Sequence, residues 1–382
     1  MSATQKNGSR FFNFLRKTGI LIVIYGLAFV FCKELYATYW EWQPIYLFVN
    51  HNKYNHSASP NFTKIANTGI NKAEPFVMKI NSQGLRENLD IQIPKPKGIY
   101  RILLVGDSFV FGGKTQLSKM LEKALNNSKE TNIKFEVINC GTPSFSPILH
   151  IARLKHQHLS FDPDAIIYMP DLSDIYDDTH RYKGFAVFDE NENIVKVKGS
   201  SRAFRAKRRH KRFIKKWATK FGLYQSTTRD ITTKQKIHLQ HIFDHARESE
   251  SNLSSYTKDE LQFSMNSIRK YVKITQAKGI HLSFIMYPHY SQIVPESVAY
   301  SSDFDGVHNR VFEKAVQNFA ETANIPFKSL YDEIKIEVKS GKNLYYWNDM
   351  HFNNAGMRIL GQALTNWVIN HPEEAAGYTT GH

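Results

Sequence analysis

Apolar residues in this chain follow two spacings, one typical of buried strands and one typical of amphipathic helices. The run IYRILLVG, which ends at Gly106, is apolar almost throughout, as expected of a parallel strand covered on both faces. Four further short runs predict strands: 135–139, 165–169, 280–287 and 325–331. Helical apolar spacing occupies the segments around them: 115–126, 147–159, 256–277, 309–322 and 354–370. Alternating strands and helices predict an α/β fold, a three-layer α/β/α sandwich around a five-stranded parallel sheet.

The N-terminus carries a basic leader followed by an apolar run. The run TGILIVIYGLAFVFC, from Thr18 to Cys32, is shorter than the roughly 20 residues that a spanning helix needs. It continues after Lys33 and Glu34 as LYATYWEW, which is typical of an interfacial aromatic belt. We predict a cytoplasmic leader over 1–17 and a transmembrane signal anchor over 18–40, with the rest of the chain in the periplasm or the extracellular space. A cleaved signal peptide is the competing interpretation, although no small-x-small cleavage site is present.

Composition divides the remainder of the chain. Residues 41–75 are rich in Asn, His, Ser and Thr and have weak periodicity, which predicts a juxtamembrane linker. We expect the main domain over 76–372, with an insert over 179–255 and a tail over 373–382.

The net charge of +15 suggests a nucleic-acid partner until the cations are located. Residues 202–216 contain nine Lys and Arg, and the leader contains four more, so thirteen of the fifteen excess charges lie in two short segments. The rest of the chain is close to neutral, and a broad nucleic-acid footprint is not supported.

The basic insert interleaves these cations with aromatic residues. It has four interpretations: an amphipathic helix on anionic lipid, an anionic-glycan site, a mobile lid, or a solvated helical face. We predict that it recognises a negatively charged polymer or the membrane surface through a group of four cations: Arg208, Arg209, Lys211 and Arg212.

Ligands of parallel α/β folds bind beyond the carboxyl ends of the strands, so chemistry is expected there. Ser108, in VGDSF, follows the first predicted strand by two residues and precedes a helix. A serine at that place is suited to act as a nucleophile whose own N–H also donates to an oxyanion. The alternative is a serine that only caps the helix.

The segment NDMHFNNAG precedes the last predicted helix. His351 follows Asp349 by two residues, and Asn353 or Asn354 can cap the helix and fix the loop. A histidine so placed can act as a general base while the acid orients it. A surface loop or half a metal site are the alternatives, and no companion ligands occur at metal spacing.

Two more segments end at the same edge. Gly141, in INCGTPSFSP, closes the second strand, and its N–H can approach a reacting oxygen because glycine has no side chain in the way. Ser173, in YMPDLSDIYDD, is a candidate side-chain donor. Taken alone, Gly141 is better explained as a simple strand-to-turn glycine, and the alternative for Ser173 is a turn residue with exposed acids.

Taken together, these segments resemble the SGNH (GDSL-like) hydrolase superfamily. The matching blocks are Gly106-Asp107-Ser108, Asn139-Cys140-Gly141, Ser173-Asp174 and Asp349-Met350-His351. The segment INSQGLR, from Ile80 to Arg86, is also similar to a stretch found in membrane-anchored relatives of bacterial surface-polysaccharide clusters. The resemblance covers roughly Val77 to Ile369 and implies the flavodoxin-like SGNH fold.

The resemblance also implies roles for these residues. Ser108 would be the nucleophile, His351 the base and Asp349 the orienting acid, while the N–H groups of Ser108 and Gly141 and the hydroxyl of Ser173 would form the oxyanion hole. No metal or cofactor is implied. Three departures from the family pattern occur: Ser173 replaces an asparagine, Asp349 lies two rather than three residues before the histidine, and Phe109 replaces a leucine.

Acyl transfer is the chemistry implied. We expect a serine-dependent ester hydrolase or O-acyltransferase that acts on O-acyl, notably acetyl, groups of a carbohydrate outside the cytoplasm. One alternative is a non-catalytic, anchored SGNH-like domain that binds or scaffolds polysaccharide machinery. The other is a lipid esterase acting at the bilayer.

Overall fold

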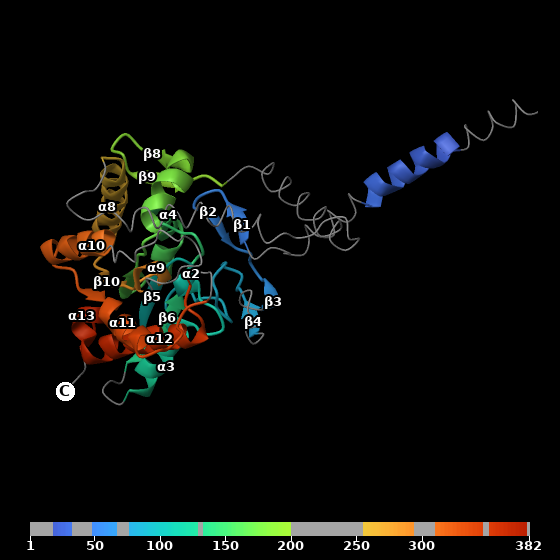
Figure 1. Ribbon diagram of the computed structural model, residues 1–382. Coiled ribbons are helices and arrows are strands. Elements are labelled where there is room, and N and C mark those ends of the chain that lie inside the picture. The colour runs from blue at the N-terminus through green and yellow to red at the C-terminus, as the bar shows by residue number, and fades with distance from the viewer. Residues whose placement is uncertain are drawn as a thin grey trace, which may run out of the picture. The chain divides into compact units, whose positions relative to one another are not determined.

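The computed structural model describes residues 18–32, 48–66, 76–128, 133–199, 255–293, 310–346 and 351–379. The chain divides into two compact units, Met1–Leu47 and Phe48–His382. All of the strands and the candidate site belong to the second unit (Figure 1).

A five-stranded sheet forms the centre of the second unit. Its order is β11-β10-β7-β5-β6, and all four pairings are parallel. The bounds are β5 Ile99–Gly106, β6 Lys134–Asn139, β7 Ala165–Met169, β10 His281–Met286 and β11 Phe327–Ser329. The chain runs from β5 outward to β6 and then crosses to β7 on the other side of β5. This is the flavodoxin-like order, and its switch point lies between the carboxyl ends of β5 and β7.

Alternation along the strands produces two hydrophobic cores. Leu103, Val105 and Tyr168 face one core, whereas Ile102 and Leu104 face the other. Since successive side chains of a strand point to opposite faces, an apolar run such as that of β5 must be covered on both. The predicted three-layer α/β/α sandwich with its five-stranded parallel sheet is confirmed.

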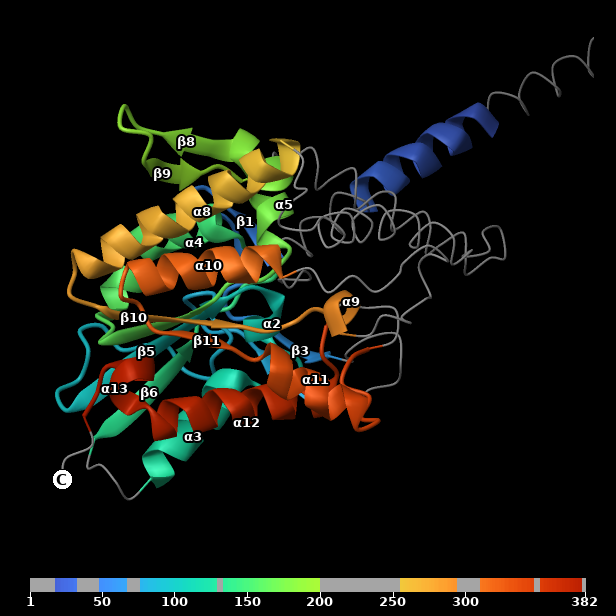
Figure 2. The same ribbon diagram turned by 60° about the vertical axis from the view of Figure 1, so that its left-hand side comes forward.

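Helices cover both faces of the sheet (Figure 2). The first core includes residues of α4 Pro147–His156, α8 Ser255–Gln276 and α10 Val311–Thr322. The second includes residues of α3 Leu117–Asn127, α11 Tyr331–Lys339, α12 Asn354–Asn370 and α13 Pro372–Ala376. The short helices at the loops are α2 Ser108–Phe111, η1 His158–Phe161, α5 Asp174–Tyr176, η2 Asp177–Tyr182, η3 Lys183–Phe185 and α9 Tyr290–Ile293.

Three two-stranded sheets surround the sandwich. They pair β1 Phe48–His51 with β2 Asn55–Ala58, β3 Thr63–Ala66 with β4 Phe76–Lys79, and β8 Ala186–Phe188 with β9 Ile194–Val197. The compact unit therefore starts at Phe48, inside the segment 41–75 that was expected to be a linker. Because this segment is mostly polar, its hairpin was not predicted. The hairpin packs on the rest of the unit through ring contacts, with centroid distances of 5.7 Å between Phe48 and Phe111 and 4.9 Å between His56 and Phe145.

The apolar leader forms a helix over residues 18–32. Among the described residues, no helix has the combined length and apolarity needed to cross a membrane. The transmembrane helix predicted over 18–40 is thus not found in the described part of the chain, where the helix covers only the apolar run itself.

Candidate active site

The candidate site lies at the carboxyl edge of the sheet, around helix α2. Asp107 caps this helix: its Oδ1 accepts a hydrogen bond from the Phe109 N–H at 2.9 Å. The sequence left open that Ser108 only caps this helix; the capping residue is Asp107 instead. Ser108 occupies the first helical position, where a backbone N–H has no carbonyl partner within the helix. Ser108, a partly exposed residue, is thus the first residue of the helix that follows β5.

The Ser108 hydroxyl meets the imidazole of His351. The Oγ–Nε2 distance is 2.7 Å, between residues that are 243 positions apart in the chain. A second acceptor is close, because Oδ2 of Asp107 lies 2.9 Å from the same Oγ. A hydroxyl has one hydrogen to donate, so the protonation state of Asp107 decides whether His351 receives it.

Packing and backbone bonds hold the His351 loop. Its carbonyl accepts the Tyr346 N–H at 3.0 Å, and the ring lies 4.8 Å from that of Phe109. Asn353 caps α12, with Oδ1 accepting the N–H groups of Ala355 and Gly356. Of the two asparagines expected to cap this helix, Asn353 does so, and it fixes the loop that presents the imidazole.

Asp107 and Asp171 form a buried pair of carboxyl groups at the switch point. Burial and the charge of Asp171 raise the pKa of Asp107 well above its ordinary value. Burial also acts to raise the pKa of Asp171, but His289 and the donors of Ser173 hold it below its ordinary value. The opposite directions of the two pKa shifts favour Asp171 as the charged member of the pair and Asp107 as the protonated member, which donates to Asp171. A protonated carboxyl accepts more weakly than a carboxylate, which favours His351 as the acceptor of the Ser108 hydrogen.

His289 is the histidine that the sequence did not single out. It follows β10, is 1% exposed, and places Nε2 at 3.6 Å from Oδ2 of Asp171. The ring of Phe109 packs near both histidines, with centroid distances of 5.4 Å to His289 and 4.8 Å to His351. Tyr287, from the same strand end, places its hydroxyl 3.5 Å from Oδ1 of Asp107.

Gly141 lies next to α2, but its N–H is already hydrogen-bonded within the protein. That group donates to Oδ1 of Asn139 at 3.0 Å. A Cβ at position 141 would lie 2.2 Å from the backbone nitrogen of Phe111, so only glycine fits this approach. The expected closeness to the nucleophile is present, while the N–H has a different acceptor from the one predicted.

Ser173 also lies near the site, and its donors are likewise already hydrogen-bonded. Its backbone N–H and its hydroxyl both donate to Oδ1 of Asp171, at 2.7 and 2.6 Å. The side chain is 5% exposed. The alternative, in which Ser173 is a turn residue among exposed acids, does not fit, because α5 and η2 pack against α8. The acids of this segment are buried: Asp171, Asp174, Asp177 and Asp178.

Five predicted site residues lie outside the described residues. They are Asp349, the orienting acid, and the four cations of the insert, Arg208, Arg209, Lys211 and Arg212. Their roles stay predictions.

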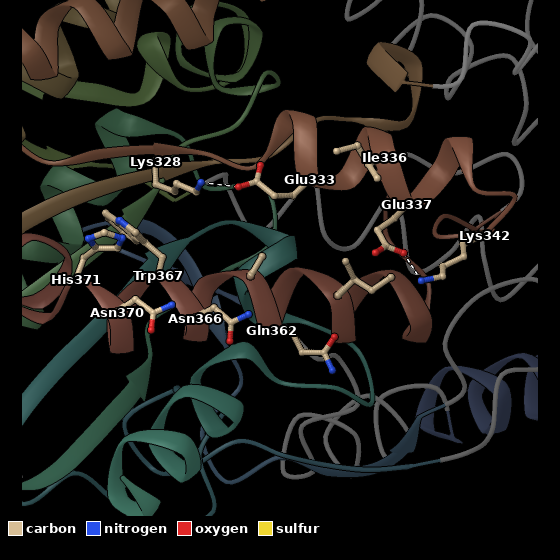
Figure 3. A pocket seen from close by; sticks show the side chains of 12 residues that line it. Lys328, Glu333, Ile336, Glu337, Lys342, Gln362, Asn366, Trp367, Asn370 and His371 are labelled. Atoms are coloured by element: carbon tan, nitrogen blue, oxygen red, sulfur yellow. Dashed lines mark hydrogen bonds and ion pairs between the residues drawn. The ribbon is translucent and has the colours of Figure 1, made fainter. Parts of the chain in front are cut away.

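A separate cavity of about 540 Å³ lies between α11 and α12 (Figure 3). Its walls carry the ion pairs Lys328–Glu333 and Lys342–Glu337 and a row of amides on α12. Neither Ser108 nor His351 lines it. The cavity is therefore distinct from the candidate active site.

The residues that sequence reasoning missed are Asp107, Asp171 and His289. A signal was available for the two acids, since both directly follow predicted strands. Nothing in the sequence marked His289 as buried, because its position depends on how β10 is placed beside β7.

No protein-family model matches the chain, and no curated protein sequence matches it significantly. Solved structures that it resembles include a lipase/acylhydrolase from Enterococcus faecalis, 13% identical, with a TM-score of 0.37 over 71% of this chain and 96% of that one. Another is a catalytic mutant of an acetylxylan esterase from Geobacillus stearothermophilus, 13% identical, with a TM-score of 0.40 over 70% and 93% of the two chains. A third is a two-domain esterase active on acetylated mannans, 13% identical, with a TM-score of 0.37 over 74% and 52%. Identities and TM-scores this low assign no function to this chain.

Proposed function

We propose that this protein is a serine-dependent ester hydrolase or O-acyltransferase. The observation that supports the proposal is the 2.7 Å contact between Ser108 Oγ and His351 Nε2 at the carboxyl edge of the sheet. A nucleophile and a base in hydrogen-bond contact, next to a helix N-terminus, are what acyl transfer requires. The resemblance of the sequence to SGNH hydrolases points to the same chemistry.

The proposed reaction begins when His351 takes the Ser108 proton and Oγ attacks the ester carbonyl carbon. The oxyanion that forms meets the Ser108 N–H. Protonated His351 then gives its proton to the leaving alkoxide as the acyl–oxygen bond breaks. Water, or a sugar hydroxyl, then loses a proton to His351 and attacks the acyl carbon. As the bond from the acyl carbon to Oγ breaks, His351 gives this proton to Ser108 Oγ, which restores the enzyme.

The acidic pair keeps this reaction possible. A protonated Asp107 donates its one hydrogen to Asp171 and is a weaker acceptor for the Ser108 hydroxyl than a carboxylate would be, so the serine hydrogen is directed at His351. Gly141 and Ser173 contribute to the oxyanion hole only if they exchange their present acceptors, Asn139 and Asp171, for the developing oxyanion.

The substrate class rests on the sequence alone. The resemblance of Ile80–Arg86 to proteins of surface-polysaccharide clusters supports an O-acetylated carbohydrate as the substrate. Action outside the cytoplasm stays a prediction from the apolar leader.

A non-catalytic binding domain is the second candidate, and one observation favours it. Both predicted oxyanion donors other than the Ser108 N–H are already bonded within the protein. A site that cannot release them would stabilise an oxyanion with a single donor and would turn over slowly.

A fluorophosphonate probe distinguishes the two candidates. We expect the folded protein to be labelled at Ser108, and labelling to vanish in Ser108→Ala but persist in Ser160→Ala, which changes an exposed serine of η1. Release of acetate from acetylated xylan or mannan, compared with release of fatty acid from lipid vesicles, then tests the substrate class. A folded protein that is not labelled would favour the binding domain.

A further inference from the structure

The segment from Ile80 to Arg86 lies beneath the candidate site, and Arg86 contacts the nucleophile helix directly. The guanidinium of Arg86 donates to three consecutive carbonyl oxygens, those of Phe111, Gly112 and Gly113. It is 2% exposed. One side chain therefore holds the whole carboxyl end of α2 and the turn that follows.

Helix α2 needs such a partner because it contains only four residues. The last carbonyls of a helix have no donor within it, and a buried carbonyl without a donor is costly. Gly112 adopts a φ of +73°, which turns the chain so that successive carbonyls converge on the guanidinium. The rings of Phe76 and Phe111 hold Arg86, each with its centroid 5.3 Å from the guanidinium carbon.

The next residue holds the neighbouring loop. Oε1 of Glu87 accepts the Asn139 N–H at 2.8 Å, and Oε2 pairs with Nζ of Lys119 at 2.8 Å. Asn139 in turn accepts the Gly141 N–H. Glu87 thus fixes the strand end from which Gly141 approaches α2.

Both residues are held in unfavourable surroundings for a charge. Burial lowers the pKa of Arg86 to about 10, and burial raises the pKa of Glu87 despite the pairing with Lys119. An apolar pair would fill the same space at a lower cost in free energy. We therefore expect these two charged side chains, which are buried against the loops of Ser108 and Gly141, to do more than complete the core.

We propose that Arg86 and Glu87 are positioning residues for the ester-cleaving reaction, because Arg86 fixes the helix that carries Ser108 and Glu87 fixes the loop that carries Gly141. The proposal rests on the proposed function. Displacing a reacting group by about 1 Å can reduce the rate by about 10²-fold. The expected signature is a lower kcat with a nearly unchanged KM, since neither residue is placed to bind substrate.

Arg101 provides a matched control at the opposite edge of the sheet. It is also fully buried, donates to the carbonyls of Phe161 and Gln92, and pairs with Glu136. Replacing it disturbs a comparable set of bonds far from α2. Any loss that reflects folding alone should therefore appear in both arginine variants.

The experiment measures kcat, KM and the melting temperature of Arg86→Gln, Arg86→Lys, Glu87→Ala and Arg101→Gln with 4-nitrophenyl acetate, with rates normalised to folded protein. We expect kcat to fall about 10- to 100-fold in Arg86→Gln with KM within about threefold. Arg86→Lys should recover only part of this, because an ammonium lacks the planar fork that reaches three carbonyls. Arg101→Gln should keep the wild-type kcat. Equal kcat in Arg86→Gln and Arg101→Gln would overturn the proposal.

Amide hydrogen exchange separates this proposal from the proposed function. If the wild type is not labelled by fluorophosphonate, the esterase proposal fails by itself. Positioning then predicts faster exchange at the amide of Gly112 in Arg86→Gln and at those of Asn139 and Gly141 in Glu87→Ala, with none of these in Arg101→Gln. Unchanged exchange in the first two variants would sink the positioning role, whatever the chemistry.

Discussion

The two edges of the central sheet arrange their charged groups in different ways. Where β5 begins, Arg101 pairs with Glu136 at 2.6 Å, and Asp164 just before β7 pairs with Lys95 at 2.7 Å. Where the same strands end, Asp107 and Asp171 lie close enough for each to change the pKa of the other. At the first edge each acid has a cation. At the second, one acid raises the proton affinity of its neighbour.

This difference separates a structural arrangement from a chemical one. At the amino edge the opposite charges are paired, and these pairs stabilise the fold. Carboxyl groups brought together at the carboxyl edge cannot all ionise, so one of them stays neutral and can donate a hydrogen bond. Perturbed acids beside a serine–histidine contact are the pattern expected of an active site. The contrast predicts that equally buried residues at the two edges respond differently to substitution.

The largest expected effect is that of His351→Ala. Removing His351 leaves Ser108 without its general base, so kcat for ester hydrolysis should fall by about 10⁴-fold or more. The measurement is steady-state hydrolysis of 4-nitrophenyl acetate, with folding checked by circular dichroism. His281→Ala is the matched control, because His281 begins β10 at the other edge and its imidazole is described in a hydrogen bond with the Glu374 carbonyl, away from Ser108. Similar losses in both variants would contradict the difference between the edges.

The next effect concerns the shared proton of the acidic pair. In Asp171→Asn the repelling charge is gone, so the pKa of Asp107 falls and ionised Asp107 competes with His351 for the Ser108 hydrogen. We expect kcat/KM to drop about 10- to 100-fold, and to drop more at pH 8 than at pH 5, because Asp107 loses its proton as the pH rises.

Asp107→Asn is the companion to that variant. An amide can donate to Asp171 and accept the Phe109 N–H, as the protonated carboxyl does, so activity should stay within about tenfold. The double variant should lose the pH-dependent defect of Asp171→Asn. A loss of 10²-fold or more in Asp107→Asn would mean that Asp107 works as an anion.

The sequence was sufficient for the sandwich and for the serine–histidine contact, because both follow from local patterns. An apolar run such as that of β5 has to be buried on both faces, and Ser108 and His351 each lie directly beside a predicted element end. The acidic pair could not be predicted in the same way. Asp107 and Asp171 change each other's ionisation only because β5 and β7 are neighbours, a relation that no single stretch of sequence contains.

The hairpin that begins at Phe48 was missed for a related reason. Its residues are mostly polar, and its attachment depends on a few contacts with distant loops, such as His56 Nε2 with the Pro143 carbonyl at 2.9 Å. The burial of the acids after β7 could not be predicted from this segment alone, because acids are exposed in most proteins and here depend on the packing of α5 and η2 against α8.

A smaller effect is expected for Ser173→Ala. The family pattern assigns this position to an oxyanion donor, whose loss would reduce kcat about 10²- to 10³-fold. Here the hydroxyl donates to Asp171 at 2.6 Å, and the Ser173 N–H keeps its own bond to the same oxygen in the variant. We expect kcat to fall less than about tenfold. A loss in the larger range would show that the hydroxyl turns from Asp171 to the oxyanion during the reaction.

The smallest effect on activity, and one that should appear in stability, is that of Asp178→Asn. Burial raises the pKa of Asp178 to about 7, from an ordinary value near 4, even though its oxygens accept from the Ile148 N–H and the Ser264 hydroxyl. Between these two pH values the folded protein holds a proton that the unfolded chain has released, so the free energy of unfolding falls as the pH rises. Asp178→Asn should remove this pH dependence. Relative to the wild type, its free energy of unfolding should rise by roughly 2–4 kcal/mol as the pH goes from 4.5 to 7.5, measured by urea denaturation. Asp164→Asn, at the amino edge, should instead destabilise at pH 7.5 because Lys95 loses its partner. If Asp178→Asn tracks the wild type across this range, Asp178 is ionised in the fold and the contrast between the two edges does not extend beyond Asp107 and Asp171.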